Sequence, residues 1–288
     1  MVNFNLFPKG KVVIIATEKS ITFMLKKNLL IVLIALPVVL SAQIDTLKLN
    51  RQFIQKGWRD TKKLVTAPAR WDSRDWTTAG VLTASLAALT LVDQPVQDAF
   101  QDWHTQAGKS GERITANFLE PLGEEYALAV IGGFMAHGLL AGNSKSQSTA
   151  LLAGESFLLA SLFVQIPKRL IGRARPDTGA DPFEFNGPLE GTGFPSGHTT
   201  AAFAVASVIA NQYADTPAIP IISYSIATAA GLSRIYDNRH WLSDVAGGVV
   251  LGILVGNLVS EKYNKNTRVA LVPFRSGSIQ GVKLAYTL

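Results

Sequence analysis

Cysteine is absent from the sequence, which excludes disulfide bonds, thiolate catalysis and zinc sites built on cysteine. Charge is scarce, because 17% of the 288 residues are charged whereas 48% are hydrophobic. With a mean hydropathy of +0.22, the chain falls among membrane proteins or at the apolar edge of soluble ones. The basic and aromatic pattern of a nucleic-acid module is also missing, so the net charge of +6 favours anionic lipid or phosphate as the partner.

The amino-terminal region has the layout of a secretory signal peptide. From Met24 the sequence reads MLKKNLLIVLIALPVVLSAQ, in which two lysines precede an apolar run at 29–40 and two small residues, Ser41 and Ala42. The run is short for a membrane span, which favours a signal that is cleaved after Ala42. Leu40 stands where such cleavage sites prefer a small residue, so an uncleaved anchor is the alternative. The residues before Met24 would be an unusual prefix, and we expect translation to start at Met24.

The chain is expected to divide into four regions: a prefix and signal at 1–42, a basic arm at 43–75, a helical domain at 76–262 and a tail at 263–288. The arm carries eight Lys or Arg against four Asp, with apolar residues at a loose helical spacing. It is expected to lie on an anionic membrane surface or to pack as an ordinary arm. In the tail, apolar and other residues alternate around the sequence RSGS, which predicts a short β-hairpin of unknown role.

Six apolar segments, rich in Ala, Leu, Val and Gly, predict an all-α core. Several are shorter than the roughly 20 residues that cross a bilayer, and Glu155 interrupts the third. With flanking residues added to these segments, a membrane-embedded bundle of about six helices is expected. Because several segments are short, a soluble helical core is the alternative. The segments cover residues 77–92, 126–141, 150–166, 201–210, 219–232 and 245–259.

The residues that carry chemistry gather in three clusters at the ends of these segments. The first, KRLIGRARP at 168–176, places Lys168 and Arg175 two helical turns apart, so that they project from nearly one face. Alone, such a cluster is typical of the basic flank of a membrane helix.

The second cluster, PSGH at 195–198, opens the fourth apolar segment. Ser196 can cap the helix, and Gly197 lets the backbone approach a ligand closely. Unpaired amides at a helix start attract phosphate oxygens. The alternative is a plain helix cap followed by an exposed histidine, His198.

The third cluster, SRIYDNRHWLSD at 233–244, places His240 and Asp244 four residues apart. On a helix the carboxylate can reach the imidazole, fix its tautomer and favour its cationic form. A histidine oriented in this way is a candidate nucleophile or base. The alternative is a surface ion pair.

The other two histidines do not belong to such a cluster. His104 lies in a polar stretch and His137 in the middle of the second apolar segment, and both are expected to be structural. Glu124 and Glu125 begin a helix, where acidic residues are favourable in any case.

Taken together, the three clusters read K-x6-RP, PSGH and SR-x5-H-x3-D, and they resemble the signature of the type 2 phosphatidic acid phosphatase superfamily. This superfamily also includes bacterial class A acid phosphatases and vanadium haloperoxidases. Every specified residue is present. The resemblance covers residues 168–244 directly, and the arrangement of helices extends it over about 77–259.

The resemblance implies a hydrolase that works through a phosphohistidine. His240, oriented by Asp244, would attack phosphorus and so divide a difficult displacement into two steps. His198 would protonate the leaving oxygen and then activate water.

The same resemblance implies that no metal or other cofactor is needed. Three cations would surround one phosphoryl group, and the sequence contains neither an HExxH motif nor an Asp-rich metal loop. The residues implied to hold the phosphate oxygens are Lys168, Arg175, Ser196, Gly197 through its amide, and Arg234.

Apolar helices around such a site suit a lipid substrate, such as phosphatidic acid, phosphatidylglycerol phosphate, undecaprenyl diphosphate or lipid A. A soluble periplasmic acid phosphatase of broad specificity is one alternative. A vanadate-dependent peroxidase is disfavoured, because exported helical members of the superfamily are usually phosphatases. A non-catalytic binder or transporter of phospholipid headgroups is disfavoured by the presence of His198, His240 and Asp244. The sequence does not indicate an oligomeric state.

The three clusters follow the third segment, precede the fourth and separate the fifth from the sixth, which puts them on one face of a membrane. In bacterial members of the superfamily this face is periplasmic. With the signal cleaved, an even number of crossings must precede Lys168. Three candidate segments precede it, and the one at 77–92, with its Thr and Ser content, is expected not to span. The protein is thus expected in the cell envelope, either in the inner membrane with its site facing the periplasm or soluble in the periplasm.

Overall fold

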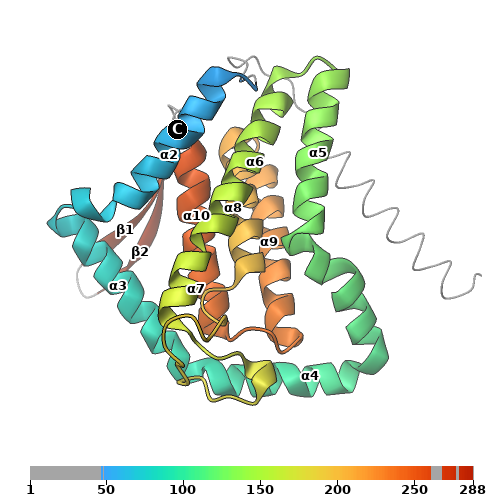
Figure 1. Ribbon diagram of the computed structural model, residues 1–288, viewed down its shortest axis with the longest axis vertical. Helices are drawn as coiled ribbons and strands as arrows, with labels where there is room; N and C mark the ends of the chain where they lie inside the picture. Colours follow the sequence, from blue (N-terminus) through green and yellow to red (C-terminus); the bar gives the residue numbers. More distant parts are fainter. Residues whose placement is uncertain (1–46, 48, 261–267, 277–278, 288) are drawn as a thin grey trace, which may run out of the picture.

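The computed structural model describes residue 47 and residues 49–260, 268–276 and 279–287. The predicted prefix and signal peptide, 1–42, lie outside these residues. Helices dominate the described chain and form a bundle, and a two-stranded β-ribbon follows at its C-terminal end (Figure 1). The predicted all-α fold is confirmed.

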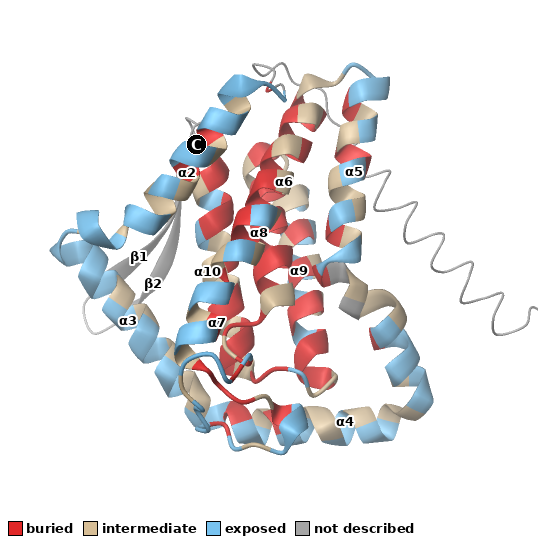
Figure 2. Ribbon diagram, viewed as in Figure 1, coloured by how far each residue is buried: buried red, intermediate tan, exposed pale blue. Residues whose placement is uncertain are grey.

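Five helices make up the core of the bundle. The central one is α8, which contacts α6, α9 and α10 and has thirteen of its sixteen residues buried. Figure 2 shows this burial along its length. Each apolar segment predicted between residues 126 and 259 falls on one of the five to within a few residues. They are α5 (Glu125–Leu140), α6 (Ser144–Phe163), α8 (Gly197–Gln212), α9 (Ala218–Tyr236) and α10 (Leu242–Ser260).

A row of glycines brings α10 close to α8. The row consists of Gly248, Gly252 and Gly256, which recur every fourth residue and therefore share one face of α10. A Cβ atom added at Gly248 would lie 2.7 Å from the carbonyl oxygen of Ser196, and one at Gly252 would lie 2.5 Å from that of Thr200. Small residues of this kind allow helix backbones to approach closely. The glycine row therefore fixes the start of α8 beside the start of α10.

The basic arm forms α2 (Arg51–Thr66) and packs on α6. The ammonium group of Lys56 donates to Asp60 at 2.6 Å and to both carboxylate oxygens of Glu155 at 3.0 and 3.2 Å. All three side chains are buried, and we call them the α2–α6 cluster. The cluster explains how α6 tolerates Glu155 in its middle, because a buried charge needs a partner.

Two further helices lie outside the five-helix core, α3 (Ser73–Leu89) and α4 (Asp93–Ile114). The first contains most of the predicted segment nearest the arm, whereas the second was not predicted. In Figure 1, α4 runs across the lower end of the bundle. Its Gln97 donates to the carbonyl of Ile235 (3.2 Å) and to the side chain of Asn238 (2.7 Å), which holds α4 against the end of α9. Short turns join these elements: η2 (Pro68–Arg70), η3 (Thr90–Val92), η4 (Thr115–Leu119) and η5 (Glu120–Gly123).

A short helix, α7 (Gln165–Ile171), follows α6 and ends at Gly172. Gly172 has a φ of 60°, a left-handed conformation that glycine adopts without strain at a helix end. The chain then enters the loop 173–196, which contains the 3-10 turn η6 (Pro176–Thr178). Arg173, the first residue of this loop, is fully buried at 1% exposure.

The tail contains β1 (Arg268–Ser276) and β2 (Ile279–Thr287), which pair antiparallel. Arg268 lies opposite Thr287 at one end of the ladder, and Ser276 lies opposite Ile279 at the other. The hairpin that the alternation predicted is present.

Four helical stretches of the described chain are long and apolar enough to cross a membrane, namely Ser73–Leu119, Ser144–Ile171, Ala218–Tyr236 and Leu242–Ser260. The apolar window of the first is only 6% buried, so α3 leaves its surface to the surroundings of the protein. These are the helices of a membrane protein. The segment expected not to span, 77–92, lies within the first stretch, so length and composition do not support leaving it out.

Candidate active site

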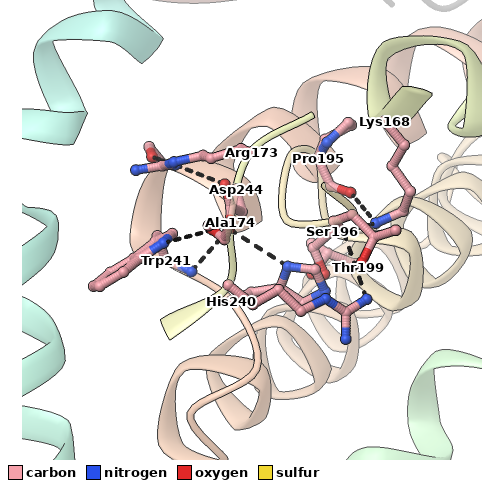
Figure 3. Close-up of polar contacts among 12 residues, drawn as sticks. Lys168, Arg173, Ala174, Pro195, Ser196, Thr199, His240, Trp241 and Asp244 are labelled. Carbon is pink, nitrogen blue, oxygen red and sulfur yellow. Dashed lines mark hydrogen bonds and ion pairs between the residues drawn. The ribbon is translucent and has the colours of Figure 1, made fainter. Parts of the chain in front are cut away.

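The three sequence motifs meet at one end of the bundle, where α7 ends and where α8 and α10 begin (Figure 3). The ammonium group of Lys168 donates to the carbonyl of Pro195 at 2.8 Å, which joins the first motif to the second. The amide of Ser196 donates to the carbonyl of Asp244 at 2.9 Å, which joins the second to the third. The indole of Trp241 closes the ring of contacts by donating to a carbonyl of the first motif at 3.2 Å.

Two cations of the first motif line this site. Lys168 is buried and also donates to the carbonyl of Thr192 at 2.8 Å. The guanidinium of Arg175 reaches the same carbonyl at 3.5 Å, and its buried Nε has no hydrogen-bond partner in the described part of the chain. A buried donor of this kind is costly unless a ligand satisfies it.

The third cation, Arg234, comes from the last turn of α9 and is 3% exposed. It donates to the carboxylate of Asp237 at 3.3 Å. Arg234 also lines a polar hollow of about 230 Å³ together with Arg239 and His104. The hollow gives the cation an opening toward the outside of the bundle.

Ser196 occupies the N-cap position of α8, as predicted, but its side chain does not cap the helix. Its hydroxyl accepts a hydrogen bond from that of Thr199 at 2.9 Å instead, so the predicted cap through the serine side chain is wrong. At Gly197 a Cβ atom would lie 3.8 Å from Cε of Lys168, which is an ordinary contact. The protein itself therefore leaves room for a side chain at this position.

His198 stands in the first turn of α8, with its side chain 31% exposed. Its Nδ1 lies 3.9 Å from a carboxylate oxygen of Glu124. A Cβ atom at Gly123 would collide with the ring of His198, so the turn before α5 lies directly against this histidine. The sequence explained Glu124 only as a favourable acid at a helix start and missed its position beside His198.

His240 lies between the carboxylate of Asp244 and the cations of the first motif, and it is 3% exposed. Its Nδ1 is 3.5 Å from Asp244 Oδ2, and this nitrogen makes no hydrogen bond to the residues that the structure describes. The pKa of His240 is lowered to about 4, chiefly by burial; Asp244 raises it, and Lys168 and Arg175 add to the lowering. The carboxylate favours the cationic form, as predicted, but burial outweighs it, so the ring is neutral at neutral pH.

Asp244 has two further partners that hold its carboxylate. Oδ1 accepts from Nη1 of Arg173 at 2.7 Å, and Oδ2 accepts from the amide of Trp241 at 3.0 Å. Arg173 lies inside the first motif, between its two specified cations, and the sequence reasoning passed over it. Arg173 stands out in the structure through its burial. The sequence gives no sign of this burial, because a loop residue has no hydrophobic periodicity around it.

The two remaining histidines have local partners. Nδ1 of His137 lies 2.8 Å from the hydroxyl of Ser146, within hydrogen-bond distance, as expected for a structural histidine. The ring of His104 packs against that of Tyr236, with 4.8 Å between ring centroids. Because His104 also lines the hollow that contains Arg234, it lies closer to the site than its polar stretch suggested.

Buried cations, a helix N-terminus and two histidines are the components of a site for a phosphate group. Comparison of the sequence with protein families indicates which family the chain resembles. Residues 149–268 match the PAP2 superfamily. The match begins in α6 and ends at the start of β1, so it includes all three motifs.

The proteins that resemble the chain include two curated phosphatases and one solved structure. Over 119 residues it is 38% identical to the lipid A 1-phosphatase of Porphyromonas gingivalis, covering 41% of this chain and 24% of the relative. Over 109 residues it is 35% identical to the decaprenylphosphoryl-5-phosphoribose phosphatase of Mycobacterium tuberculosis, covering 38% and 58%. LpxE of Aquifex aeolicus aligns with 22% identity and a TM-score of 0.45, covering 57% of this chain and 93% of that one. The chain thus spans between a quarter and three fifths of the two curated relatives.

Proposed function

We propose that the protein is a metal-independent phosphatase that hydrolyses phosphomonoester or diphosphate groups of lipids through a phosphohistidine. The observation that carries this proposal is the placement of His240. Its ring is buried and neutral, one nitrogen faces Asp244, and the cations Lys168 and Arg175 lie close enough to influence its charge. A neutral imidazole has the free electron pair that attack on phosphorus requires.

In the first step, the ring nitrogen that does not face Asp244 attacks phosphorus. A P–N bond forms and the P–O bond to the lipid breaks, while His198 donates a proton to the leaving oxygen. The imidazole becomes cationic, and the carboxylate of Asp244 stabilises it. In the second step, His198 takes a proton from water, water oxygen attacks phosphorus, the P–N bond breaks and inorganic phosphate leaves.

The phosphate oxygens are held by the cations and by the start of α8. Lys168 has three N–H groups, and two of them donate to the carbonyls of Thr192 and Pro195, which leaves one for the substrate. Arg175 offers its unpartnered Nε, and Arg234 adds a third positive charge. The hydroxyl of Ser196 and the amide of Gly197 complete the predicted set, where charge develops in the transition state.

An apolar hollow next to the site favours a lipid over a soluble ester. It has a volume of about 510 Å³, lies between α4 and α9, and is lined by residues such as Trp103, Leu232 and Tyr236. Thr115 lines both this hollow and the polar one that contains Arg234. A phosphate near Arg234 therefore has an apolar channel beside it for the chain of a lipid. The relatives, named as phosphatases of lipid A and of decaprenylphosphoryl-5-phosphoribose, act on lipids of this kind.

We further propose that the protein lies in the inner membrane of a bacterium with its site facing the periplasm. The motifs lie together at one end of helices long enough to cross a bilayer, so a single membrane face collects them. In this arrangement the regions 43–75, 76–262 and 263–288 act as a packing arm, the phosphatase domain and an appended hairpin.

The test is a phosphate-release assay of the detergent-purified protein on lipid A, phosphatidic acid, phosphatidylglycerol phosphate and undecaprenyl diphosphate, beside a soluble phosphate ester. We expect release from at least one lipid, unaffected by EDTA, and acid-labile phosphate on His240. His240→Ala should abolish both, whereas His137→Gln, which keeps a hydrogen-bonding group near Ser146, should retain activity. Release by His240→Ala at the wild-type rate would refute the mechanism, and preference for the soluble ester would support the acid phosphatase alternative.

A further inference from the structure

A row of buried charged groups runs from α4 to His240. Asp93, at the start of α4, accepts a hydrogen bond from Arg173 at 2.7 Å, and Arg173 donates to Asp244 at 2.7 Å. Asp244 in turn faces His240 at 3.5 Å. Asp93, Arg173 and Asp244 are each at most 1% exposed, and we call them the α4–α10 cluster. Figure 3 shows Arg173 on the side of Asp244 away from Lys168.

Arg173 has no capacity left for a substrate. Its Nη1 donates to Asp244 and to the hydroxyl of Ser243 at 2.6 Å. Its Nη2 donates to Asp93 and to the carbonyl of Pro182 at 2.6 Å, and its Nε donates to the same carbonyl at 2.9 Å. Every nitrogen of the guanidinium is therefore used inside the protein. In this respect Arg173 differs from Arg175, which has a buried nitrogen without a partner.

Asp93 fixes the beginning of α10. Its Oδ1 accepts from the amide of Ser243 at 2.8 Å, and its Oδ2 accepts from the hydroxyl of the same residue at 2.5 Å. The amide belongs to the first turn of α10, where N–H groups lack partners within the helix. Asp93 thus acts as a cap supplied from another helix, and it holds the turn that carries Asp244.

We propose that Arg173 and Asp93 are positioning residues, which hold the Asp244 carboxylate in the orientation that lets it serve His240. This inference rests on the proposed phosphohistidine mechanism. Arg173 binds Oδ1 of Asp244, which leaves Oδ2 turned toward Nδ1 of the ring. Without the guanidinium, the carboxylate would lose the contact that fixes its rotation, and two acidic groups would remain buried without a cation.

The charges of the cluster also match the mechanism. Two carboxylates and one guanidinium carry a net charge of −1, which a cationic His240 would neutralise in the phosphoenzyme. Lys168 and Arg175 lie outside the cluster and oppose the positive charge on the ring. The α4–α10 cluster therefore favours the intermediate over the resting enzyme, which is the direction that accelerates attack.

The experiment compares Arg173→Lys, Arg173→Met and Asp93→Asn in the full-length protein, with Arg169→Met as the control in the same motif. On the lipid substrate identified for the wild type, we expect kcat to fall about tenfold to hundredfold for Arg173→Met and Asp93→Asn with KM unchanged. Arg173→Lys should recover part of the loss, and Arg169→Met should resemble the wild type. Arg173→Met should also move the acid limb of kcat/KM to higher pH, because the lost cation no longer opposes protonation of His240.

A merely structural role would lower the amount of folded enzyme without moving the pH profile or the rate of phosphohistidine formation per folded molecule. Wild-type kcat in both Asp93→Asn and Arg173→Lys would overturn the inference, and so would a raised KM with unchanged kcat, which would assign Arg173 to substrate binding. If Arg173→Met does not fold, Asp93→Asn and Arg173→Lys decide the question. Failure of the proposed function is distinguishable, since the wild type itself would then form no phosphohistidine.

Discussion

The described part of the chain contains two buried clusters in which one cation bridges two carboxylates, and only one of these clusters adjoins the candidate site. In the α2–α6 cluster, Lys56 bridges two carboxylates, and in the α4–α10 cluster, Arg173 does the same. The first joins one helix to the middle of another and includes no residue of the sequence motifs. The second ends at His240, whose Nδ1 has no hydrogen bond within the described residues. We infer that a buried ion cluster indicates a functional site only where it ends at a reactive side chain that still lacks a hydrogen bond, as His240 does.

The largest difference between the clusters should appear when one carboxylate of each is neutralised. Asp244→Asn removes the charge that stabilises a cationic His240, so we expect kcat to fall by a factor of about 10³–10⁴. Asp60→Asn makes the same chemical change in the α2–α6 cluster and should leave kcat within about twofold of the wild type. Both values are measured as phosphate release at saturating lipid substrate, at equal concentrations of folded protein. Similar losses in the two variants would remove the functional distinction between the clusters.

A second, smaller effect should appear in stability when the cation of the α2–α6 cluster is lost. Lys56→Met leaves two carboxylates buried without a positive charge, so the free energy of unfolding should fall by about 3–5 kcal/mol. Arg59→Met, at an exposed position of the same helix, is the matched control and should have little effect. Unfolding in detergent micelles gives the comparison, and kcat below the transition should stay close to the wild-type value. A large loss of kcat with intact folding would mean that the α2–α6 cluster also serves the site.

The smallest effect concerns pH. Since burial lowers the pKa of His240 to about 4 from an ordinary value near 6.5, the ring stays neutral as pH falls through 6.5 and becomes protonated only near 4. The acid limb of kcat/KM should therefore lie near pH 4, and loss of the nucleophile should change the rate by less than about twofold between pH 7 and 5.5. Lys56→Met should leave this limb in place. An acid limb at 6.5, in enzyme that regains full activity on return to pH 7, would contradict the burial of the ring.

Much of the core could be predicted because its signal is local in the sequence. The segment predicted at 201–210 falls inside α8, because a run rich in Ala, Val and Phe favours a helix that avoids water. The spacing of His240 and Asp244 likewise placed two site residues within reach of each other. Such features depend only on neighbours along the chain, which is why they can be read before the fold is known.

The unpredicted features depend on distant parts of the chain. Asp93 lies 80 positions before Arg173, and α4 is too polar for its hydrophobic pattern to stand out. The spacing of His240 and Asp244 revealed the carboxylate beside the ring but not how little water reaches it, so the lowered pKa of His240 could not be predicted. At Ser196, sequence position alone could not show that the hydroxyl bonds to the side chain of Thr199 rather than capping the helix.

The glycine row on α10 has a mechanical consequence. Because Gly248 and Gly252 leave no room between α10 and the backbone of α8, the helix that carries His198 and the one that carries Asp244 must move as a single body. A lipid headgroup cannot enter by separating them. The hollow that contains Arg234 is lined instead by residues of α4 and of the end of α9, so a headgroup can reach it without parting α8 from α10. The rigid pair of helices would thus keep His198 and Asp244 at a constant separation while a lipid binds.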